Sequence, residues 1–288
     1  MSSIKNIENF YFVGIGGIGM SALARYFNLQ GKNVFGYDRT PSKITDSLIN
    51  EGVSIQFKDD DSLIPDVIQE NKNTLIVCTP AIPKNNKILT WLQSKKYSIT
   101  KRSELLGEIS KNSVCLAVAG THGKTTTSAI LGHLLASCNM PVTAFLGGVT
   151  ENYNSNLIYK GSEIMVVEAD EFDRSFLHLN PTIACVTSMD ADHLDIYGTT
   201  SELENTFVDF SKLVPDSNNL LFKKGLPLEG KTVSATQNAD FEARNVRIED
   251  GSYVFDLKTP TEEIKNLRFH LPGRHNMFNA VTALGMAI

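Results

Sequence analysis

The sequence predicts an α/β protein of two domains, each built around a parallel β-sheet. Short apolar runs alternate with amphipathic helical patterns through most of the 288 residues, as in parallel strands joined by crossover helices. Two of the strand-to-helix connections are rich in glycine, which lets a backbone approach a phosphate group closely. The strand-like runs of the second half are apolar almost throughout, as expected for parallel strands buried on both faces.

The composition is that of an ordinary globular protein. Hydrophobic residues make up 42% of the chain and charged residues 20%, so nothing favours disorder. The net charge of -5 gives no electrostatic reason to expect a nucleic acid or an anionic membrane as partner. An anionic substrate would therefore need local pockets of positive charge.

The N-terminus and the cysteines predict a cytoplasmic protein. The polar start of the chain does not have the pattern of a signal peptide, and no apolar run is long enough to cross a membrane. Four cysteines lie in or near apolar runs without C-x-x-C spacing, and we interpret them as buried free thiols of a reducing compartment: Cys78, Cys115, Cys138 and Cys185.

A glycine-rich turn follows the first apolar run, Phe10 to Val13, and opens an amphipathic helix. It has the G-x-G-x-x-G spacing, and the next strand ends on an acidic residue; the candidate binding residues are Gly14, Gly16, Gly17, Gly19 and Asp38. In a Rossmann-like domain such a turn lies against a diphosphate, and the carboxylate binds a ribose hydroxyl. The motif does not separate NAD from a UDP-sugar, and an interpretation in which the glycines serve only a tight turn stays open.

The domain boundary is expected after a helix at Ser103 to Ile109, where the polar stretch from Ser110 to Ser113 begins. Residues 1–109 then form the Rossmann-like domain and residues 110–288 a second α/β domain. Four apolar runs predict its strands: 114–119, 142–145, 164–168 and 183–187. Between Ser217 and His270 the sequence becomes polar and weakly alternating, which predicts a small antiparallel appendage.

The connection after the apolar run at 114–119 has the composition of a phosphate-binding loop. Its residues Gly120, Thr121, His122, Gly123, Lys124, Thr125 and Thr126 lead directly into a helical pattern. Backbone N–H groups at such a helix start bind an anion, Lys124 adds a positive charge, and the Thr125 hydroxyl can bind Mg2+. The spacing departs from the standard P-loop because Val118 occupies the first glycine position. An ordinary strand-to-helix turn that merely contains a lysine is the alternative.

Acidic residues follow two further strands of this domain. Glu168 ends one strand and is a candidate Mg2+ ligand. We interpret Glu171 and Asp173 as a solvated helix start, favoured by the helix dipole. His193 lies among three carboxylates in the next such segment, and a metal ligand and a histidine held by salt bridges both remain possible.

The last helical pattern contributes two amides and runs to the end of the chain. Asn276 and Asn279 stand at its start, where they can read a purine edge or cap the helix. Apolar residues keep a helical spacing up to Ile288 without a stop signal, and we therefore expect a fragment of a longer protein.

Five segments of the chain together resemble the Mur ligases of peptidoglycan synthesis. In chain order they are GIGGIGMSALA from Gly14, GTHGKTTT from Gly120, EADEFDRSF from Glu168, ADHLDIY from Ala191 and PGRHNMFNA from Pro272. The motifs are most similar to those of the family members that attach L-alanine to UDP-N-acetylmuramate. Sister ligases use a carbamylated lysine after the histidine motif, but residues 198–211 contain no lysine, so none is predicted.

The resemblance implies a role for each motif. Residues 1–109 would bind UDP-N-acetylmuramate, and residues 110–288 would bind ATP. Lys124 would contact the β- and γ-phosphates, Thr125 and Glu168 would bind Mg2+, and His193 would serve a second metal ion. Asn276 and Asn279 would lie near the adenine. Lys124, Glu168 and His193 are therefore the predicted catalytic residues.

The implied reaction passes the γ-phosphoryl group of ATP to the lactyl carboxylate of UDP-N-acetylmuramate, and L-alanine then attacks the acyl phosphate. Lys124 and two Mg2+ ions would offset the negative charge that collects there. The family's third domain, which brings the amino acid, has no counterpart in these residues. We therefore predict that the 288-residue chain binds the UDP-sugar but does not ligate.

Three alternatives remain at the level of the sequence. A recycling ligase that adds a preformed tripeptide to the same sugar would share most motifs. An NAD-dependent oxidoreductase would use the first glycine turn but leaves the Lys124 loop unexplained. A nucleotide-binding module without enzymatic activity is the third.

Overall fold

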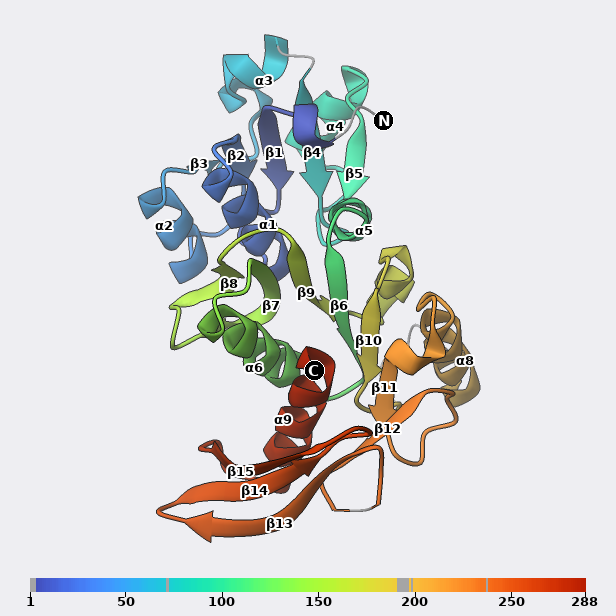
Figure 1. Cartoon of the computed structure of the whole chain (residues 1–288). Helices are drawn as coiled ribbons and strands as arrows, with labels where there is room; N and C mark the ends of the chain where they lie inside the picture. Colours follow the sequence, from blue (N-terminus) through green and yellow to red (C-terminus); the bar gives the residue numbers. More distant parts are fainter. Residues whose placement is uncertain (1–3, 71–72, 191–196, 198, 237) are drawn as a thin grey trace. The chain divides into compact units, whose positions relative to one another are not determined.

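A computed structural model of the chain describes residues 4–70, 73–190, 197, 199–236 and 238–288 (Figure 1). The chain forms two compact units. The first comprises Met1–Glu108 and Gly147–Leu157, and the second Ile109–Leu146 and Ile158–Ile288. The first unit thus includes a segment, 147–157, that lies beyond the range 1–109 assigned to the first domain from the sequence.

The first unit is built on a five-stranded sheet in the order β3-β2-β1-β4-β5. Each neighbouring pair of strands is parallel. The strands are β1 (Asn9–Val13), β2 (Asn33–Tyr37), β3 (Ser54–Gln56), β4 (Thr74–Cys78) and β5 (Ile99–Lys101). The strand order reverses at β1, which confirms the Rossmann-like arrangement predicted from the sequence.

Helices cover both faces of this sheet. They are α1 (Ile18–Leu29), α2 (Lys43–Asn50), α3 (Asp66–Glu70), α4 (Lys87–Ser94), α5 (Arg102–Ser110) and the short 3-10 helices η1 (Ile4–Asn6) and η2 (Asp61–Leu63). Successive side chains of β1 point to opposite faces. Phe10 therefore stacks on Phe27 of α1, with ring centroids 3.8 Å apart, while Tyr11 joins a second apolar cluster with Ile88 and Leu92 of α4.

The second sheet has ten strands in the order β15-β14-β13-β12-β11-β10-β6-β9-β7-β8. Its strands are β6 (Val114–Ala119), β7 (Val142–Thr150), β8 (Ser155–Tyr159), β9 (Ile164–Ala169), β10 (Ile183–Val186), β11 (Leu220–Lys223), β12 (Lys231–Ser234), β13 (Phe241–Glu249), β14 (Ser252–Lys258) and β15 (Glu263–Phe269). The pairs from β7 through β9, β6, β10, β11 and β12 to β13 are parallel. The predicted α/β fold of this domain is confirmed.

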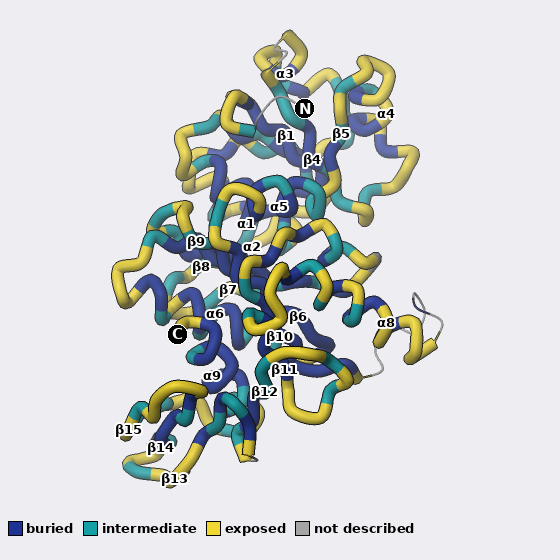
Figure 2. Tube along the Cα trace, turned by 45° about the vertical axis from the view of Figure 1, so that its right-hand side comes forward, coloured by how far each residue is buried: buried dark blue, intermediate teal, exposed yellow. Residues whose placement is uncertain are grey.

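The antiparallel appendage is confirmed only in part. β13, β14 and β15 pair in antiparallel fashion, but β11 and β12 are parallel members of the main sheet. The prediction that the appendage begins at Ser217 was therefore wrong. Buried Leu220, Leu221 and Phe222 form β11, and such a short apolar strand is easily missed beside polar turns. Figure 2 shows the contrast between the buried β6 and β10 and the largely exposed outer strands β13 and β15.

The described residues of the second unit also form three α-helices, α6 (Lys124–Ser137), α8 (Thr200–Ser211) and α9 (Arg274–Ala287), and two 3-10 helices, η3 (Phe172–His178) and η4 (Ser217–Asn219). Helices α6 and α9 pack against each other, and α9 also contacts β10 to β13 (Figure 1). Helix α8 packs on η3 through aromatic rings, with Phe210 stacked on Phe176 at 4.7 Å. These contacts fix α6, α9 and η3 around the ends of the central strands.

Residues 147–157 are anchored within the first unit by a buried polar network. Asn156 is fully buried, and its Nδ2 donates to the Ser21 hydroxyl at 2.9 Å and to the carbonyl of Ile18 at 2.5 Å. Arg25 donates to Asn156 Oδ1 and, through Nε, to both carboxylate oxygens of Glu51 at 2.9 Å. Helix α1 is thus bonded to a segment that is remote in sequence.

The cysteines follow the sequence prediction in part: Cys115 and Cys185 are buried, and Cys78 is half-buried. All four are free thiols, and burial raises the pKa of Cys115 and of Cys185 to about 12. Cys138 is exposed, so its assignment as a buried thiol was wrong. It caps the C-terminus of α6 beyond the last buried turn, where a helical apolar pattern no longer implies burial. Within the described ranges, we find no helix that is both long and apolar enough to cross a membrane.

Candidate functional site

The glycine-rich turn of the first unit lies where β1 and its two neighbours end at one edge of the sheet. Val13 is in register with Tyr37 and Cys78, so Gly14 and Asp38 leave their strands side by side. In open α/β sheets this carboxyl edge is where ligands bind. The structure thereby brings together the glycine turn and the acidic residue that the sequence predicts for one site.

Asp38 is held directly against the turn. Its Oδ2 accepts the Gly16 N–H at 2.8 Å, and its Oδ1 accepts the Thr40 N–H at 3.1 Å. A Cβ atom at Gly16 would lie 2.8 Å from the same Oδ2, so only glycine fits beside this carboxylate. The turn then passes to α1, whose N-cap Gly17 has no side-chain cap. The N–H groups of the first helical turn therefore remain available to an anion.

Arg102 is a neighbour of this turn that the sequence analysis did not identify. Its side chain lies over Gly19, where an added Cβ atom would be 3.0 Å from Cδ and would overlap the guanidinium. A guanidinium at this place adds its charge to the partial positive charge of the helix N-terminus. Arg102 thus supplies the local positive charge that a protein of net charge -5 needs in order to bind an anionic ligand.

The phosphate-loop candidate of the second unit also lies at a sheet edge. Ala119 ends β6 in register with Ala169 of β9 and Val186 of β10, so the loop meets the residues that follow those strands. Gly120 has a φ of +129°, and a Cβ atom there would overlap the Thr187 hydroxyl. Gly123, with a φ of +84°, caps α6 without a side-chain cap, which leaves the first N–H groups of α6 to an anion.

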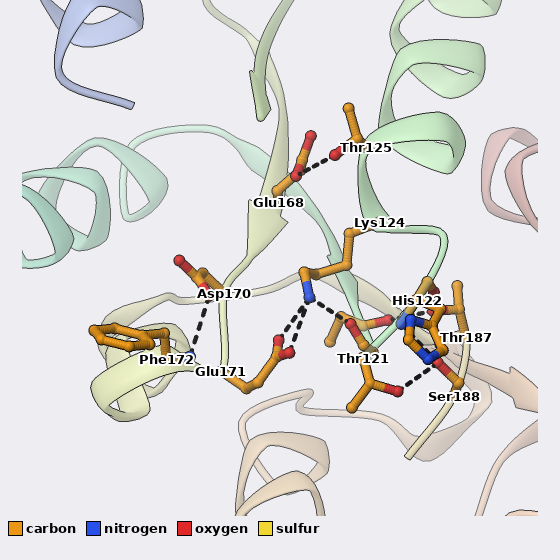
Figure 3. Close-up of polar contacts among 12 residues, drawn as sticks. Thr121, His122, Lys124, Thr125, Glu168, Asp170, Glu171, Phe172, Thr187 and Ser188 are labelled. Carbon is orange, nitrogen blue, oxygen red and sulfur yellow. Dashed lines mark hydrogen bonds and ion pairs between the residues drawn. The ribbon is translucent and has the colours of Figure 1, made fainter. Parts of the chain in front are cut away.

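Hydroxyl groups after β10 fix the first part of the loop (Figure 3). The Ser188 hydroxyl accepts the His122 N–H at 2.8 Å and lies 2.9 Å from the hydroxyl of Thr121. The Thr187 hydroxyl donates to the carbonyl of His122 at 2.5 Å. The N–H groups of Thr121 and His122 are thus engaged within the protein, since Thr121 N–H donates to the Ser188 carbonyl at 3.2 Å. Neither Thr187 nor Ser188 was singled out from the sequence, although they follow an apolar strand as Glu168 does.

Lys124 extends toward Glu171, and Figure 3 shows the two side chains in contact. Nζ lies 2.8 Å and 3.0 Å from the two carboxylate oxygens and donates to the Gly120 carbonyl at 2.6 Å. Glu171 is completely buried. Our interpretation of Glu171 as a solvated helix start was therefore wrong, because its charge is compensated by a lysine 47 positions away and not by water.

Tyr197 holds the backbone of Glu171 in place. It is buried, and its hydroxyl donates to the backbone carbonyl of Glu171. Burial raises the pKa of Tyr197, and the negative charge of Glu171 raises it further. The phenol therefore stays a neutral donor that fixes the backbone of Glu171.

Thr125 and Glu168, the two predicted Mg2+ ligands, are adjacent. The Thr125 hydroxyl donates to Glu168 Oε2 at 3.1 Å, and Thr125 itself is exposed. Hydroxyl and carboxylate oxygens at the start of a phosphate-binding helix fit Mg2+, which takes few protein ligands and completes its shell with phosphate and water. Among the described residues no group of three or more His, Cys, Asp and Glu side chains could hold a metal ion. His193 lies outside the described residues.

A cavity of about 630 Å³ adjoins the loop. His122, Gly123 and Thr126 line it from the loop side, and Asn276 and Asn279 line it from α9. Asn279 is 5% exposed, and a Cβ atom at Gly123 would lie 2.6 Å from its Oδ1. The structure thus brings both predicted asparagines to the loop.

The same cavity has features that the sequence analysis missed. Lys223 and Lys224 line it from the end of β11, and Thr236 follows β12. Asn276 is not an N-cap, because Gly273 occupies that position; its Nδ2 donates to the Pro272 carbonyl at 2.7 Å. The cavity therefore combines two amides with several cationic side chains, a chemistry suited to a nucleotide.

Sequence profiles of one family cover nearly the whole chain. The profile described as Mur ligase family, catalytic domain, matches residues 9–113, and the Mur ligase middle domain matches residues 118–287. The chain belongs to the Mur ligase family. The resemblance stated from the five motifs is confirmed, and each motif lies within the matched ranges.

Curated relatives of the Mur ligase family align along the entire chain. UDP-N-acetylmuramate–L-alanine ligase from Christiangramia forsetii is 57% identical over 100% of this chain and 64% of its own length. The enzyme of the same name from Flavobacterium psychrophilum is 58% identical over 99% of this chain and 63% of its own length. The chain thus spans slightly less than two thirds of the length of these relatives.

Solved structures of Mur ligases share the fold. UDP-N-acetylmuramate–alanine ligase from Thermotoga maritima superposes with a TM-score of 0.83 at 25% identity, over 96% of this chain and 64% of that one. UDP-N-acetylmuramate:L-alanyl-gamma-D-glutamyl-meso-diaminopimelate ligase from Neisseria meningitides gives a TM-score of 0.82 at 21% identity, over 98% and 93%. The two ligases thus fit this fold equally well.

Proposed function

We propose that this chain carries the two nucleotide-binding parts of an ATP-dependent ligase of peptidoglycan synthesis. The first unit binds UDP-N-acetylmuramate, and the second binds ATP. The whole protein joins L-alanine to the lactyl carboxylate of the UDP-sugar in the cytoplasm. The observation that carries the proposal is the loop at Lys124, which stands beside a paired hydroxyl and carboxylate and beside a nucleotide-sized cavity.

The glycine turn supports a UDP-sugar in the first unit. The uncapped start of α1 and the guanidinium of Arg102 provide for a diphosphate, and Asp38 at the end of β2 provides for a ribose hydroxyl. The glycine motif by itself does not separate NAD from a UDP-sugar. The family membership of the chain favours the UDP-sugar.

The second unit supports ATP through three groups of residues. The start of α6 and Lys124 bind the phosphates, Asn276 and Asn279 bind the adenine, and Thr125 with Glu168 binds Mg2+. Magnesium bound there neutralises negative charge on the phosphate oxygens. We assign a second ion to His193.

The chemistry explains why a carboxylate needs ATP. A carboxylate is a poor electrophile. Transfer of the γ-phosphoryl group from ATP, which leaves as ADP, converts the carboxylate into an acyl phosphate. The amine of L-alanine can then attack its carbonyl carbon, form the amide and release inorganic phosphate and a proton. Lys124 stabilises the charge on the transferring group, and the walls of the cavity orient the nucleotide. The protein's contribution is thus positioning and charge compensation.

Sequence identity favours L-alanine over a preformed tripeptide as the added group. The curated relatives with 57% and 58% identity are both named as L-alanine ligases. The tripeptide ligase from Neisseria meningitides has the same fold at 21% identity, so the fold alone does not separate the two activities.

Calorimetric titration of the 288-residue chain tests the proposal. We expect binding of UDP-N-acetylmuramate and of MgATP, no binding of NADH, and no formation of UDP-N-acetylmuramoyl-L-alanine by this chain. Tight binding of NADH without binding of the UDP-sugar would refute the proposal. Product formation by this chain would refute the part that reserves ligation for the whole protein.

A further inference from the structure

The ammonium of Lys124 is fully engaged within the second unit. A lysine ammonium has three N–H donors. Three acceptors lie around Nζ: the Gly120 carbonyl at 2.6 Å and the two Glu171 oxygens at 2.8 Å and 3.0 Å (Figure 3). A phosphate oxygen can therefore reach this ammonium only by replacing one of these three partners.

Glu171 is a rigid partner. Its side chain is 0% exposed, against 17% for Lys124. Its backbone carbonyl accepts from the Tyr197 hydroxyl and from the Arg174 N–H, the latter at 2.9 Å. The preceding carbonyl, of Asp170, accepts from the Phe176 N–H at 3.0 Å. The backbone that carries the Glu171 side chain is thus hydrogen-bonded on both sides, and the side chain itself is enclosed by protein.

Complete departure of Lys124 from this carboxylate is unfavourable. A buried carboxylate that loses its cation is left with an uncompensated charge in a medium of low polarity. A smaller movement is possible because the ammonium bonds to both carboxylate oxygens. One N–H can turn away while another keeps its hydrogen bond to Glu171. The geometry therefore favours exchange of a single hydrogen bond over breakage of the pair.

We propose that Glu171 is the positioning residue of Lys124. Its buried carboxylate holds the ammonium at the Gly120 end of the loop, so that one N–H turns onto a phosphate while the pair remains intact. This inference rests on the proposed binding of ATP by the loop. It assigns a role in nucleotide binding to a buried carboxylate that is not one of the predicted Mg2+ ligands.

A double-mutant cycle tests the inference by calorimetry with MgATP on the 288-residue chain. Lys124→Met should weaken MgATP binding more than tenfold. Glu171→Ala should weaken it about tenfold, and Glu171→Gln, which keeps one acceptor oxygen, should weaken it less. In the Lys124→Met background neither substitution at Glu171 should change MgATP affinity further, because a residue that acts through the lysine has no effect without it.

Stability measurements keep the test valid if a single variant folds poorly. The double variant Lys124→Met with Glu171→Gln removes the unpaired buried charge and should have a higher Tm than Lys124→Met alone. Asp256→Asn is the matched control, because Asp256 is a largely buried carboxylate paired with Lys265 on β14 and β15 and does not line the cavity. It should leave MgATP affinity unchanged.

A second readout does not depend on ATP. The ammonium signal of Lys124 in 15N NMR spectra should be sharp in the wild-type chain and broadened by exchange with water in Glu171→Ala. An unchanged signal would overturn the inference, and so would tighter MgATP binding by Glu171→Gln or equal losses with and without Lys124. If the wild-type chain failed to bind MgATP, the proposed function would fall, while the NMR comparison would still decide the role of Glu171.

Discussion

The two units use the same local arrangement, a strand followed by a glycine turn and a helix, but a side chain of opposite charge bonds to the backbone of each turn. At the first turn the carboxylate of Asp38 accepts the Gly16 N–H. At the second the ammonium of Lys124 donates to the Gly120 carbonyl, and its counter-ion Glu171 is buried beneath it. A shared strand–turn–helix arrangement therefore does not imply a shared ligand.

The difference matches what each proposed ligand would present to its turn. A ribose offers hydroxyl groups that donate to a carboxylate, so Asp38 suits a nucleoside diphosphate bound through its sugar. A triphosphate offers three closely spaced anionic groups, which require a lysine and a metal ion. In the proposed assignments, the ligand class is set by the charged side chain that bonds to the turn, and not by the turn itself.

Gly120→Ala should have the largest effect, because it would break the second turn without touching the first. The φ of +129° and the overlap with Thr187 make alanine unfavourable at Gly120. We expect a loss of about 3 kcal/mol in the free energy of unfolding and loss of MgATP binding, with UDP-N-acetylmuramate binding retained. Thermal unfolding and calorimetry measure both. Gly225→Ala is the control, since its φ is +100° but nothing lies within 4 Å; a loss of about 1 kcal/mol is expected.

Lys124→Ala should weaken MgATP binding by more than tenfold, since a charge-assisted phosphate contact contributes about 2 kcal/mol. It also leaves Glu171 buried without its cation, so the free energy of unfolding should fall by about 3 kcal/mol, and the Tm should fall with it. UDP-N-acetylmuramate binding should not change. Unaltered MgATP affinity in a folded variant would contradict the assignment of the loop.

Much of this comparison could be predicted from the sequence because it is local. Each turn lies within a single strand–loop–helix segment, so its glycine spacing and the neighbouring apolar run are visible in the chain itself. Asp38 and Glu168 were identified for the same reason, since each ends an apolar strand. The order of the parallel strands then follows from the βα alternation.

The residues that contact each turn from other strands and helices could not be predicted in this way. Glu171 stands in an acidic run that resembles a solvated helix start, and only the register of β6 and β9 brings it to Lys124. Arg102 reaches Gly19 from β5 and α5, and Ser188 reaches His122 from β10. The one available signal for Ser188 was its position after an apolar strand.

Glu168→Gln tests the metal at the second turn. The amide keeps the size and the hydrogen bond to Thr125 but is a weaker ligand for Mg2+. We expect about tenfold weaker ATP binding in Mg2+ and no change in excess chelator. Asp209→Asn, an exposed carboxylate on α8, should change neither value. A loss that persists in chelator would indicate a structural role for Glu168.

Arg102→Ala should have the smallest effect and should be confined to the first turn. Loss of one half-buried charge-assisted contact of about 1 kcal/mol gives roughly fivefold weaker UDP-N-acetylmuramate binding, and the loss should shrink at high salt. MgATP affinity should not change. Lys101→Ala removes a neighbouring exposed cation and serves as the control. An equal loss in both variants would mean that general charge, and not the position of Arg102, matters.

The anchoring of residues 147–157 by Arg25 has a consequence for how the chain is made. Arg25 and Asn156 are 131 positions apart, and β6, α6 and the whole of β7 are synthesised between them. Because the ribosome releases the N-terminus first, helix α1 emerges long before the amide that it bonds. The first unit begins to fold first but can be completed only after the phosphate loop of the second has left the ribosome. A cut or fusion placed between residues 108 and 109 would therefore separate the first unit from part of itself.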